Sequence, residues 1–436
     1  MKKLASIIFI QVVTYLSLAF LLVGCGTRKE PDTIIEKIHL RGQDIPLVHL
    51  GMLPDSAEMV PLSDFFEEMR IIRLETHPKC MIVNTMVEYT GHSFLISTQQ
   101  PGGAGPCRVM EFDLDGRYLR DFGKGGKGPG EHVGYFSDHM RYYPSDNKVF
   151  IAFTGMRGNE WQMFSSEGRF LKTILNPNLP GETPERFNDT TWLMPGASSG
   201  VPWQKTDSSL LIIYNEEGEV INDFPRISFP PRKGSGYSPK GWGSSLFPFN
   251  DEWHLYNPGD DTLYGVGPDK LQPLAIFKLG PNGEKFNTFI SPEQIPGTYY
   301  INFLLENKGF WIIKKSITTA VNLHENMPGR WGGMHKHAES IIWIKKDGKY
   351  ARNVKFEDNM TGLFPPDLFA NITLHWKDNY AFFVLQAVSI QELLEKQKPD
   401  YNMTETTRQC LDYIRKNVTI EDNPVIFMMK LKKTFQ

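Results

Sequence analysis

The stretch Phe112-Asp113-Leu114-Asp115-Gly116-Arg117-Tyr118-Leu119 follows the pattern aromatic-x-x-acid-Gly-x-apolar-apolar, and further copies stand at Phe164–Leu171 and Tyr214–Ile221. The acid–Gly pair is typical of a two-residue hairpin turn with both residues at positive φ, and the flanking apolar residues are typical of strands. The glycines of the three copies, Gly116, Gly168 and Gly218, stand 52 and 50 positions apart. A hairpin repeated at this period predicts a ring of small sheets, which is the architecture of a β-propeller.

Three later units complete the expected ring, although each departs from the repeated pattern. The fourth has Pro268-Asp269 where the acid–Gly pair would stand, and the fifth has Asp347-Gly348 after an insertion at about Ser316–Glu339. The sixth contains two helical stretches, Ile390–Lys396 and Glu405–Lys416. Thr404 or Thr406 is expected to cap the second stretch. The sequence therefore predicts an all-β fold, a six-bladed β-propeller of four-stranded antiparallel blades, with short helices near the C-terminus.

The closure of the ring is the next expectation. A ring of blades leaves two open edges where the first blade meets the last, and exposed edges promote aggregation. We therefore expect the two ends of the chain to complete one blade together. The candidates for the N-terminal strand are Val48–Leu50 and Met69–Leu74, and the closing strand is Val425–Lys432.

The N-terminus has the character of a secretory signal, because Lys2 and Lys3 precede a mostly apolar run. The run ends in Leu22-Val23-Gly24-Cys25, which resembles the lipobox of bacterial lipoproteins, whose Cys is acylated. Acyl chains on Cys25 would anchor the protein without a spanning helix, and the alternative is an uncleaved transmembrane anchor. We predict a lipoprotein signal peptide at residues 1–24, a polar tether at 25–45 and the propeller at 46–436. The expected location is the bacterial cell envelope, at the outer membrane.

Charge and cysteine content narrow the class of protein. The chain has 47 Lys and Arg against 50 Asp and Glu, and it has no basic stripe with interleaved aromatic residues. Nucleic acid is therefore not an expected partner. Besides Cys25 there are Cys80, Cys107 and Cys410, which cannot all pair. A Cys80–Cys107 bridge is an open option if neighbouring strands carry the two thiols.

A family resemblance rests mainly on the continuation of the first unit, Gly123-Lys124-Gly125-Gly126-Lys127-Gly128-Pro129-Gly130-Glu131. This phrase resembles a motif of the six-bladed β-propeller lipoproteins of gut-type Gram-negative bacteria, which are similar in architecture to NHL-repeat and TolB-type propellers. Weaker family-like phrases are Ile72-Arg73-Leu74-Glu75-Thr76, Asp260-Asp261-Thr262-Leu263-Tyr264 and Glu357-Asp358-Asn359. The resemblance implies a lipoprotein that faces the cell surface or the periplasm, and it implies no particular reaction.

The same Gly-rich phrase also satisfies G-x-G-x-x-G, the pattern of a dinucleotide site. That site needs a helix directly after the glycines, whereas Pro129 and Gly130 follow here. A structural loop is favoured, in which Gly128, Pro129 and Gly130 form a rigid turn. We expect Glu131 to accept backbone hydrogen bonds in this loop or to line the mouth of the ring.

Four residues are candidates for ligand contact. His335 and His337 would share one face of a strand and could meet a metal there, but no third ligand stands at a recognisable spacing, so a polar loop without metal is favoured. Trp242, in the Gly-rich segment Ile227–Asn250, and Trp331 could stack on a sugar ring. For both Trp residues, packing within or between blades is the favoured interpretation.

No catalytic set can be assigned from the sequence. Gly196-Ala197-Ser198-Ser199-Gly200 matches G-x-S-x-G but lacks the strand and helix of a nucleophile elbow. Carboxylates at the channel of a propeller enzyme would come from different blades, so sequence spacing cannot reveal them.

The leading hypothesis is a binding module for a glycan, a peptide or an envelope protein, with no cofactor. The alternative is a propeller hydrolase or lyase that acts on a glycan or a small metabolite at the central channel. A scaffold for an envelope complex is a third option. The channel lining distinguishes them, because convergent carboxylates, amides or imidazoles around an ion or pocket would favour the enzyme.

Overall fold

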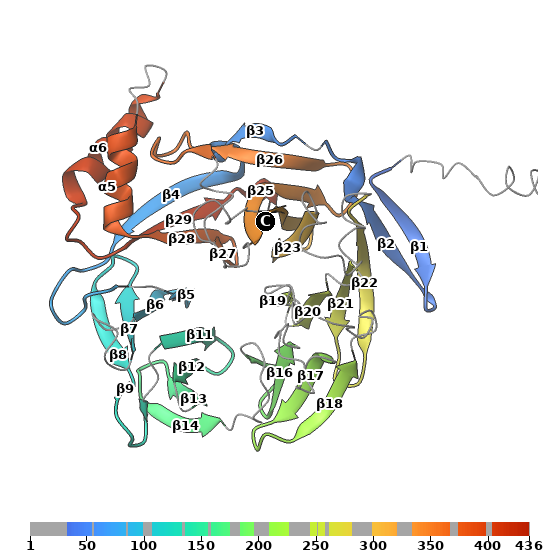
Figure 1. Ribbon diagram of the computed structural model, residues 1–436, viewed down its shortest axis with the longest axis horizontal. Helices are drawn as coiled ribbons and strands as arrows, with labels where there is room; N and C mark the ends of the chain where they lie inside the picture. Colours follow the sequence, from blue (N-terminus) through green and yellow to red (C-terminus); the bar gives the residue numbers. More distant parts are fainter. Residues whose placement is uncertain are drawn as a thin grey trace, which may run out of the picture.

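The computed structural model describes residues 33–54, 56–83, 86–98, 107–132, 136–155, 158–174, 184–195, 209–225, 245–250, 252–257, 261–280, 299–320, 334–366, 374–397 and 403–435. Six sheets form the blades of a ring around a central axis, and the strands of each blade follow one another outward from that axis (Figure 1). The predicted six-bladed β-propeller of four-stranded antiparallel blades is confirmed.

The blades follow the order of the chain. Blade 1 contains β5 (Met86–Tyr89), β6 (Ser93–Thr98), β7 (Arg108–Asp113) and β8 (Tyr118–Phe122). Blade 2 contains β11 (Phe136–Tyr143), β12 (Lys148–Gly155), β13 (Gly158–Ser165) and β14 (Phe170–Ile174). Blade 3 contains β15 (Glu185–Arg186), β16 (Thr191–Pro195), β17 (Ser209–Asn215) and β18 (Val220–Pro225). A short parallel pair, β9 (Lys124–Gly125) and β10 (Glu131–His132), lies between blades 1 and 2.

The second half of the ring has the same plan. Blade 4 contains β19 (Ser245–Phe249), β20 (Glu252–Asn257), β21 (Thr262–Val266) and β22 (Leu271–Lys278). Blade 5 contains β23 (Tyr299–Glu306), β24 (Phe310–Ala320), β25 (Met334–Lys345) and β26 (Ala351–Glu357). Blade 6 contains β27 (His375–Lys377), β28 (Tyr380–Leu385) and β29 (Val425–Leu431). Much of the expected insertion at about 316–339 belongs to the extended strands β24 and β25, whose pairing continues from Phe310 to Ala320.

The N-terminal segment closes the ring and also wraps part of it. The hairpin of β1 (Ile35–Leu40) and β2 (Gln43–His49) joins the outer edge of blade 4 through β22. The strand β3 (Glu58–Pro61) then adds to β26 of blade 5, and β4 (Phe66–Arg73) pairs with β29 as the outermost strand of blade 6 (Figure 1). Of the two predicted closing strands, the one at Met69–Leu74 is therefore confirmed, whereas Val48 pairs with blade 4.

The predicted tether at 25–45 needs a correction at its C-terminal end, because residues 35–45 belong to this hairpin. Arg41 and Gly42 both have positive φ and form its turn. The side chain of Gln43 donates a hydrogen bond to the carbonyl of Pro273, which fixes the hairpin to blade 4.

The repeated turn also differs from its predicted type. Gly116, Gly168 and Gly218 have φ of 82°, 82° and 83°, but the acidic residue before each glycine does not have positive φ. The backbone N–H of Gly116 donates to the Asp113 carbonyl, and Asp113 N–H donates to the Arg117 carbonyl. Each turn is therefore a type I turn followed by a left-handed glycine in a bulge, and not a two-residue turn.

The apolar core is divided among the six blade boundaries. In β6, Phe94 and Ile96 pack toward blade 6, whereas Leu95 packs toward blade 2, because alternate residues of a strand point to opposite faces. The other four boundaries have clusters of the same kind. Each blade is therefore held by its two neighbours.

Two helices join β28 to β29 on one side of the ring (Figure 1). The helices α5 (Ala387–Lys396) and α6 (Glu405–Asn417) pack Ile390, Leu411 and Ile414 into the cluster between blades 5 and 6. Thr404 caps α6 by accepting a hydrogen bond from Thr407 N–H. Of the two predicted caps, Thr404 and Thr406, the first is therefore confirmed. The short helices α2 (Leu62–Phe65), η1 (Leu50–Met52) and η7 (Lys433–Phe435) complete the described elements.

Cys80, Cys107 and Cys410 are not in disulfides, so Cys80 and Cys107 do not form the bridge that the sequence left open. Burial raises the pKa of the Cys80 thiol. Within the part of the chain that the structure describes, no helix is long and apolar enough to cross a membrane.

Candidate functional site

Four charged side chains of alternating sign lie on the inner strands of consecutive blades. They are Lys377 on β27, Glu88 on β5, Arg141 on β11 and Glu185 on β15, and we call this set the charged arc. Lys377 Nζ lies 3.3 Å from Glu88 Oε1, and Arg141 Nη1 lies 3.2 Å from Glu88 Oε2. The guanidinium also donates from Nε and Nη2 to Glu185 Oε1, at 2.9 and 2.8 Å. The charged arc therefore links blades 6, 1, 2 and 3 around the centre of the ring.

The position of these residues in their strands explains why they meet. Each stands near the end of an inner strand, shortly before the hairpin that leads to the second strand of its blade. Inner strands have no pairing partner on the channel side, so these polar side chains can leave the apolar blade boundaries. The backbone N–H of Tyr142 also donates to Glu88 Oε1 at 3.2 Å, which fixes that carboxylate against the next blade.

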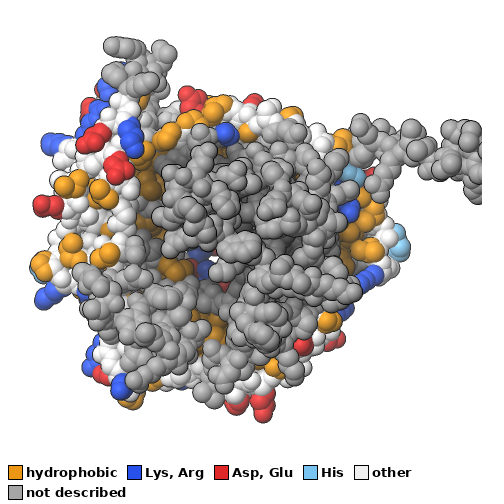
Figure 2. Space-filling view, viewed as in Figure 1, with side chains coloured by type: hydrophobic (Ala, Val, Ile, Leu, Met, Phe, Trp, Pro, Cys, Tyr) orange, Lys and Arg blue, Asp and Glu red, His pale blue; other side chains and the backbone are white. Residues whose placement is uncertain are grey.

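The cations of the arc are accessible, but its carboxylates are not. The side chains of Arg141 and Lys377 keep 36% and 23% of their surface, against 9% for Glu88 and 4% for Glu185. Figure 2 shows Lys or Arg side chains within the opening at the centre of the ring. The arc therefore presents N–H donors whose positive charge is balanced by carboxylates behind them.

The titration behaviour of the arc follows from these pairs. Burial alone would lower the pKa of Arg141, but the carboxylates of Glu185 and Glu88 outweigh it and hold that pKa above its ordinary value. Burial lowers the pKa of His375, on the same strand as Lys377, with Glu88 opposing and Arg141 adding to the shift. Its ring stacks on Phe382 at 5.3 Å. At neutral pH His375 is therefore a neutral imidazole beside the ion pairs of the arc.

The inner strand of blade 4 differs from the charged arc in its composition. The inner strand of blade 4, β19, contains Phe247, Pro248 and Phe249 and has no ionisable residue, and none of its five residues is fully buried. Figure 1 places β19 across the centre of the ring from β5. The inner strand of blade 4 therefore adds no charged side chain of its own, although Lys346 Nζ lies 4.6 Å from the Phe249 ring.

The inner strand of blade 5 ends in Glu306, which is directed away from the arc. Its carboxylate lies 2.7 Å from His254 Nδ1 and accepts hydrogen bonds from Trp311 Nε1 at 2.9 Å and Lys346 Nζ at 2.8 Å. Burial would raise the pKa of Glu306, but the bonds from His254 and Lys346 hold it below its usual range. These residues connect blade 4 to blade 5.

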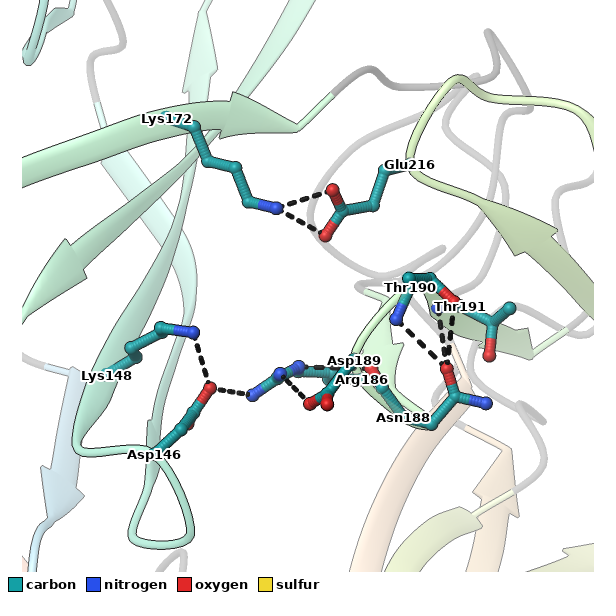
Figure 3. A network of polar contacts seen from close by, with 9 residues as sticks. All are labelled: Asp146, Lys148, Lys172, Arg186, Asn188, Asp189, Thr190, Thr191 and Glu216. Atoms are coloured by element: carbon teal, nitrogen blue, oxygen red, sulfur yellow. Dashed lines mark hydrogen bonds and ion pairs between the residues drawn. The ribbon is translucent and has the colours of Figure 1, made fainter.

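A polar network between blades 2 and 3 lies outside the arc (Figure 3). Arg186 lies between Asp146 and Asp189, at 2.6 and 2.7 Å, and Lys172 pairs with Glu216. The side chain of Asn188 accepts hydrogen bonds from Thr190 and Thr191 N–H and fixes the hairpin before β16. Here again the carboxylates are matched by cations, and the network joins neighbouring blades.

The Gly-rich loop between blades 1 and 2 is built around Glu131. Its Oε2 accepts hydrogen bonds from Lys127 N–H at 2.9 Å and Gly128 N–H at 2.8 Å, and its Oε1 pairs with Lys124 at 3.0 Å. The Gly128 N–H and the Lys124 ammonium hold the pKa of Glu131 below its usual range.

The glycines of this loop allow close packing. Gly130 has φ of 73°, and a Cβ there would lie 2.7 Å from Phe170. Gly128, Pro129 and Gly130 thus form a compact turn that contacts blade 2. Glu131 accepts backbone hydrogen bonds in this loop and contributes no described contact to the charged arc.

The remaining sequence candidates lie elsewhere. Cys25, Trp242 and Trp331 fall outside the described residues. His335 and His337 lie on β25, paired in register with Thr319 and Ile317, so the expected polar loop is a strand. Within the described ranges, no group of three or more His, Cys, Asp or Glu residues is placed to hold a metal ion.

Comparisons with known proteins identify the family. The model of a family described as "Domain of unknown function (DUF4934)" matches residues 52–430. The chain belongs to this family. No curated protein matches the sequence.

One solved structure supports the fold of this DUF4934 member, and a second gives a weaker match. A Bacteroides fragilis NCTC 9343 protein inferred to be exported matches with a TM-score of 0.58 and 14% identity, over 89% of this chain and 100% of that chain. A member of the DUF4221 family from Bacteroides vulgatus ATCC 8482 matches with a TM-score of 0.47 and 13% identity, over 84% and 97% of the two chains. At this identity the first of these likenesses shows the fold alone.

Proposed function

We propose that this protein is an exported, lipid-anchored module of the cell envelope that binds a ligand at the charged arc without converting it. The observation that carries the proposal is the pairing of both arc carboxylates with cations of the chain. Glu88 faces Lys377 and Arg141, and Glu185 receives two bonds from the same guanidinium. The arc is thus a surface of positioned donors.

The same pairing argues against hydrolysis or elimination at this place. A glycosidase needs one carboxyl that holds a proton and a second that is free to attack or to activate water. Glu88 and Glu185 converge from different blades, as such a pair would, but the guanidinium of Arg141 lies between them. Both carboxylates already accept bonds from cations of the chain, so neither is placed to attack a substrate or to activate water.

Product analysis distinguishes binding from catalysis. The full-length protein, purified in a non-glycosidic detergent, is incubated with mixed oligosaccharides and with small peptides, and each pool is examined by mass spectrometry. We expect every pool to keep its masses. Shortened chains, or products with a new double bond, would overturn the binding proposal in favour of a hydrolase or a lyase.

The export and anchoring part of the proposal rests on Leu22-Val23-Gly24-Cys25 at the end of an apolar run. The Bacteroides fragilis relative, inferred to be exported, supports it. Eight peptide units separate Cys25 from Thr33, where the described chain begins, and they span at most about 28 Å. Because β1 lies at the outer edge of blade 4, the lipid would hold that edge of the ring near the membrane.

A cysteine substitution tests the anchor. Cys25→Ser should move the protein from the membrane fraction to the soluble fraction and abolish labelling by radioactive palmitate. Cys410→Ser is the matched control, because it removes a free thiol on α6 and should change neither result. Continued membrane association of the Cys25→Ser protein would contradict the anchor.

A further inference from the structure

The charge balance of the arc limits the chemistry of its ligand. Lys377 and Arg141 contribute two positive charges, and Glu88 and Glu185 contribute two negative charges at 2.8–3.3 Å from them. An anionic ligand would meet the donors and the carboxylates behind them together, so most of its attraction would cancel while it still lost its hydration. A cationic ligand would meet the accessible cations first. A neutral ligand has no such cost.

The accessible atoms of the arc also define the hydrogen bonds on offer. Arg141 and Lys377 present N–H groups and keep 36% and 23% of their side-chain surface. Arg has five N–H donors and no acceptor, and Lys has three donors and no acceptor. The ligand must therefore supply several neutral acceptors in one small region. Hydroxyl and ring oxygens of a sugar do so.

The composition of β19 adds a second requirement. This strand lies across the centre of the ring from β5, the inner strand of Glu88 (Figure 1), and it contains Phe247, Pro248 and Phe249 but no ionisable residue. The rings of Phe247 and Phe249 contact His254, and Lys346 Nζ lies 4.6 Å from the Phe249 ring. A ligand between the two sides meets donors on one side and an apolar strand on the other. The pyranose ring has this character, because its hydroxyl oxygens lie around its edge and its C–H groups form an apolar face.

Resting on the proposed binding function, the structure assigns to the charged arc a neutral carbohydrate as its ligand. The arc holds the sugar by hydrogen bonds from Arg141 and Lys377, and the uncharged strand of blade 4 faces its C–H groups. The pairing of the cations with carboxylates sets the preference for neutral over acidic sugars.

The experiment is calorimetric titration of the full-length protein in a non-glycosidic detergent, since sugar-based detergents would occupy the site. The probes are neutral xylo-, malto- and manno-oligosaccharides, oligogalacturonate as the acidic sugar, and a mixed small-peptide pool. We expect at least one neutral series to bind. Its affinity should change less than about twofold between about 0.05 and 0.5 M NaCl, because no net charge is neutralised.

Variants locate the binding. Glu88→Gln combined with Lys377→Gln keeps the net charge but removes one cation of the arc, and should weaken neutral binding by about tenfold or more. Lys172→Gln is the matched control, because it breaks an ion pair with Glu216 between blades 2 and 3, outside the arc, and should leave affinity unchanged. Thermal unfolding of each variant confirms that the ring is intact.

Each outcome bears on the inference. Binding of oligogalacturonate or peptides that is weakened by the double variant would overturn the carbohydrate assignment and leave the binding function standing. Neutral binding that the double variant does not alter would place the sugar site elsewhere. Failure of every neutral series to bind would overturn the inference directly. Conversion of a bound sugar would instead refute the non-catalytic proposal.

Discussion

Replacing Arg141 by Met tests whether the guanidinium neutralises the carboxylates on either side of it. The variant leaves Glu185, whose side chain is 4% accessible, without its strongest cation, while Glu88 keeps Lys377 and the N–H of Tyr142. Breaking a fully buried pair costs about 3–5 kcal/mol. Because the Arg141 side chain is 36% accessible, we expect a smaller loss of about 2–3 kcal/mol.

This loss converts to a measurable shift in melting temperature. Unfolding entropy of about 2.1 cal/mol/K per residue gives about 0.8 kcal/mol per K for roughly 400 residues. Arg141→Met should therefore lower the melting temperature by about 3 °C at neutral pH. The nine Trp residues provide the fluorescence signal for the unfolding scan. Combining Arg141→Met with Glu185→Gln removes the carboxylate that lost its ion pair with Arg141 and should recover at least half of the shift.

The pH dependence separates a stranded charge from lost packing. In Arg141→Met the buried carboxyl of Glu185 avoids the cost of its charge by binding a proton, which the folded state then favours more than the unfolded chain does. The deficit is therefore largest at neutral pH and shrinks as pH falls to about 5. Equal melting temperatures for the single and double variants, or a deficit that is the same at both pH values, would refute the reasoning.

Three other predictions use contacts elsewhere in the ring. Gly116→Ala should destabilise the protein more than Gly168→Ala, although both glycines have φ of 82°. A Cβ at Gly116 would lie 2.0 Å from the Arg73 carbonyl oxygen, whereas a Cβ at Gly168 would lie 3.2 Å from the nearest carbonyl oxygen. Equal melting temperatures for the two variants would contradict this prediction. Asn423→Ala should lower the free energy of unfolding by about 2–4 kcal/mol, because the buried side-chain amide of Asn423 forms hydrogen bonds with the backbone of Glu75, Cys80 and Ile82, next to the closing strand β4. Faster proteolysis within β4 is the measurement that checks it. Glu306→Gln should destabilise most at neutral pH, because a carboxyl whose folded pKa is depressed contributes stability that is fully present above its unfolded pKa of about 4.3. The deficit should shrink as pH falls below that value, and a deficit that stays constant in acid would refute this.

The repeated hairpin was sufficient to predict the ring, because both the turn and the strands around it are local. Phe112 and Tyr118 pair in register across the turn at Gly116, so one short phrase determines two outer strands of a blade. The turn type was predicted wrongly because the acid–Gly pair suits two different turns. The two turns are distinguished only by the strand register, because the loop observed here has one residue more than a two-residue turn.

The N-terminal strands were harder to assign, since their partners lie far along the chain. Val48 pairs with Phe277, and Val60 pairs with Phe356, each as an added parallel strand. Short apolar stretches of this kind indicate a strand but not its sheet. The His335 and His337 pair was misassigned to a loop for a related reason, since β25 extends well beyond the blade.

The charged arc could not be predicted from spacing. Lys377 and Glu88 are 289 positions apart, and Arg141 stands 53 positions after Glu88. The one available signal was local, a charged residue shortly before the first hairpin of a blade. The Gly128–Glu131 phrase is the more conspicuous motif in the sequence, but the Glu131 carboxylate forms its hydrogen bonds and its ion pair within its own loop.

The most direct test of the account is hydrogen–deuterium exchange of the full-length protein with and without a bound neutral oligosaccharide. We predict slower exchange in the segments that carry the charged arc and in β19, with no change in the outermost strands β8, β14 and β18. The segments expected to be protected are Met86–Tyr89, Phe136–Tyr143, Glu185–Arg186, Ser245–Phe249 and His375–Lys377. Protection confined to the outer strands or to the helices α5 and α6 would contradict ligand binding at the centre of the ring.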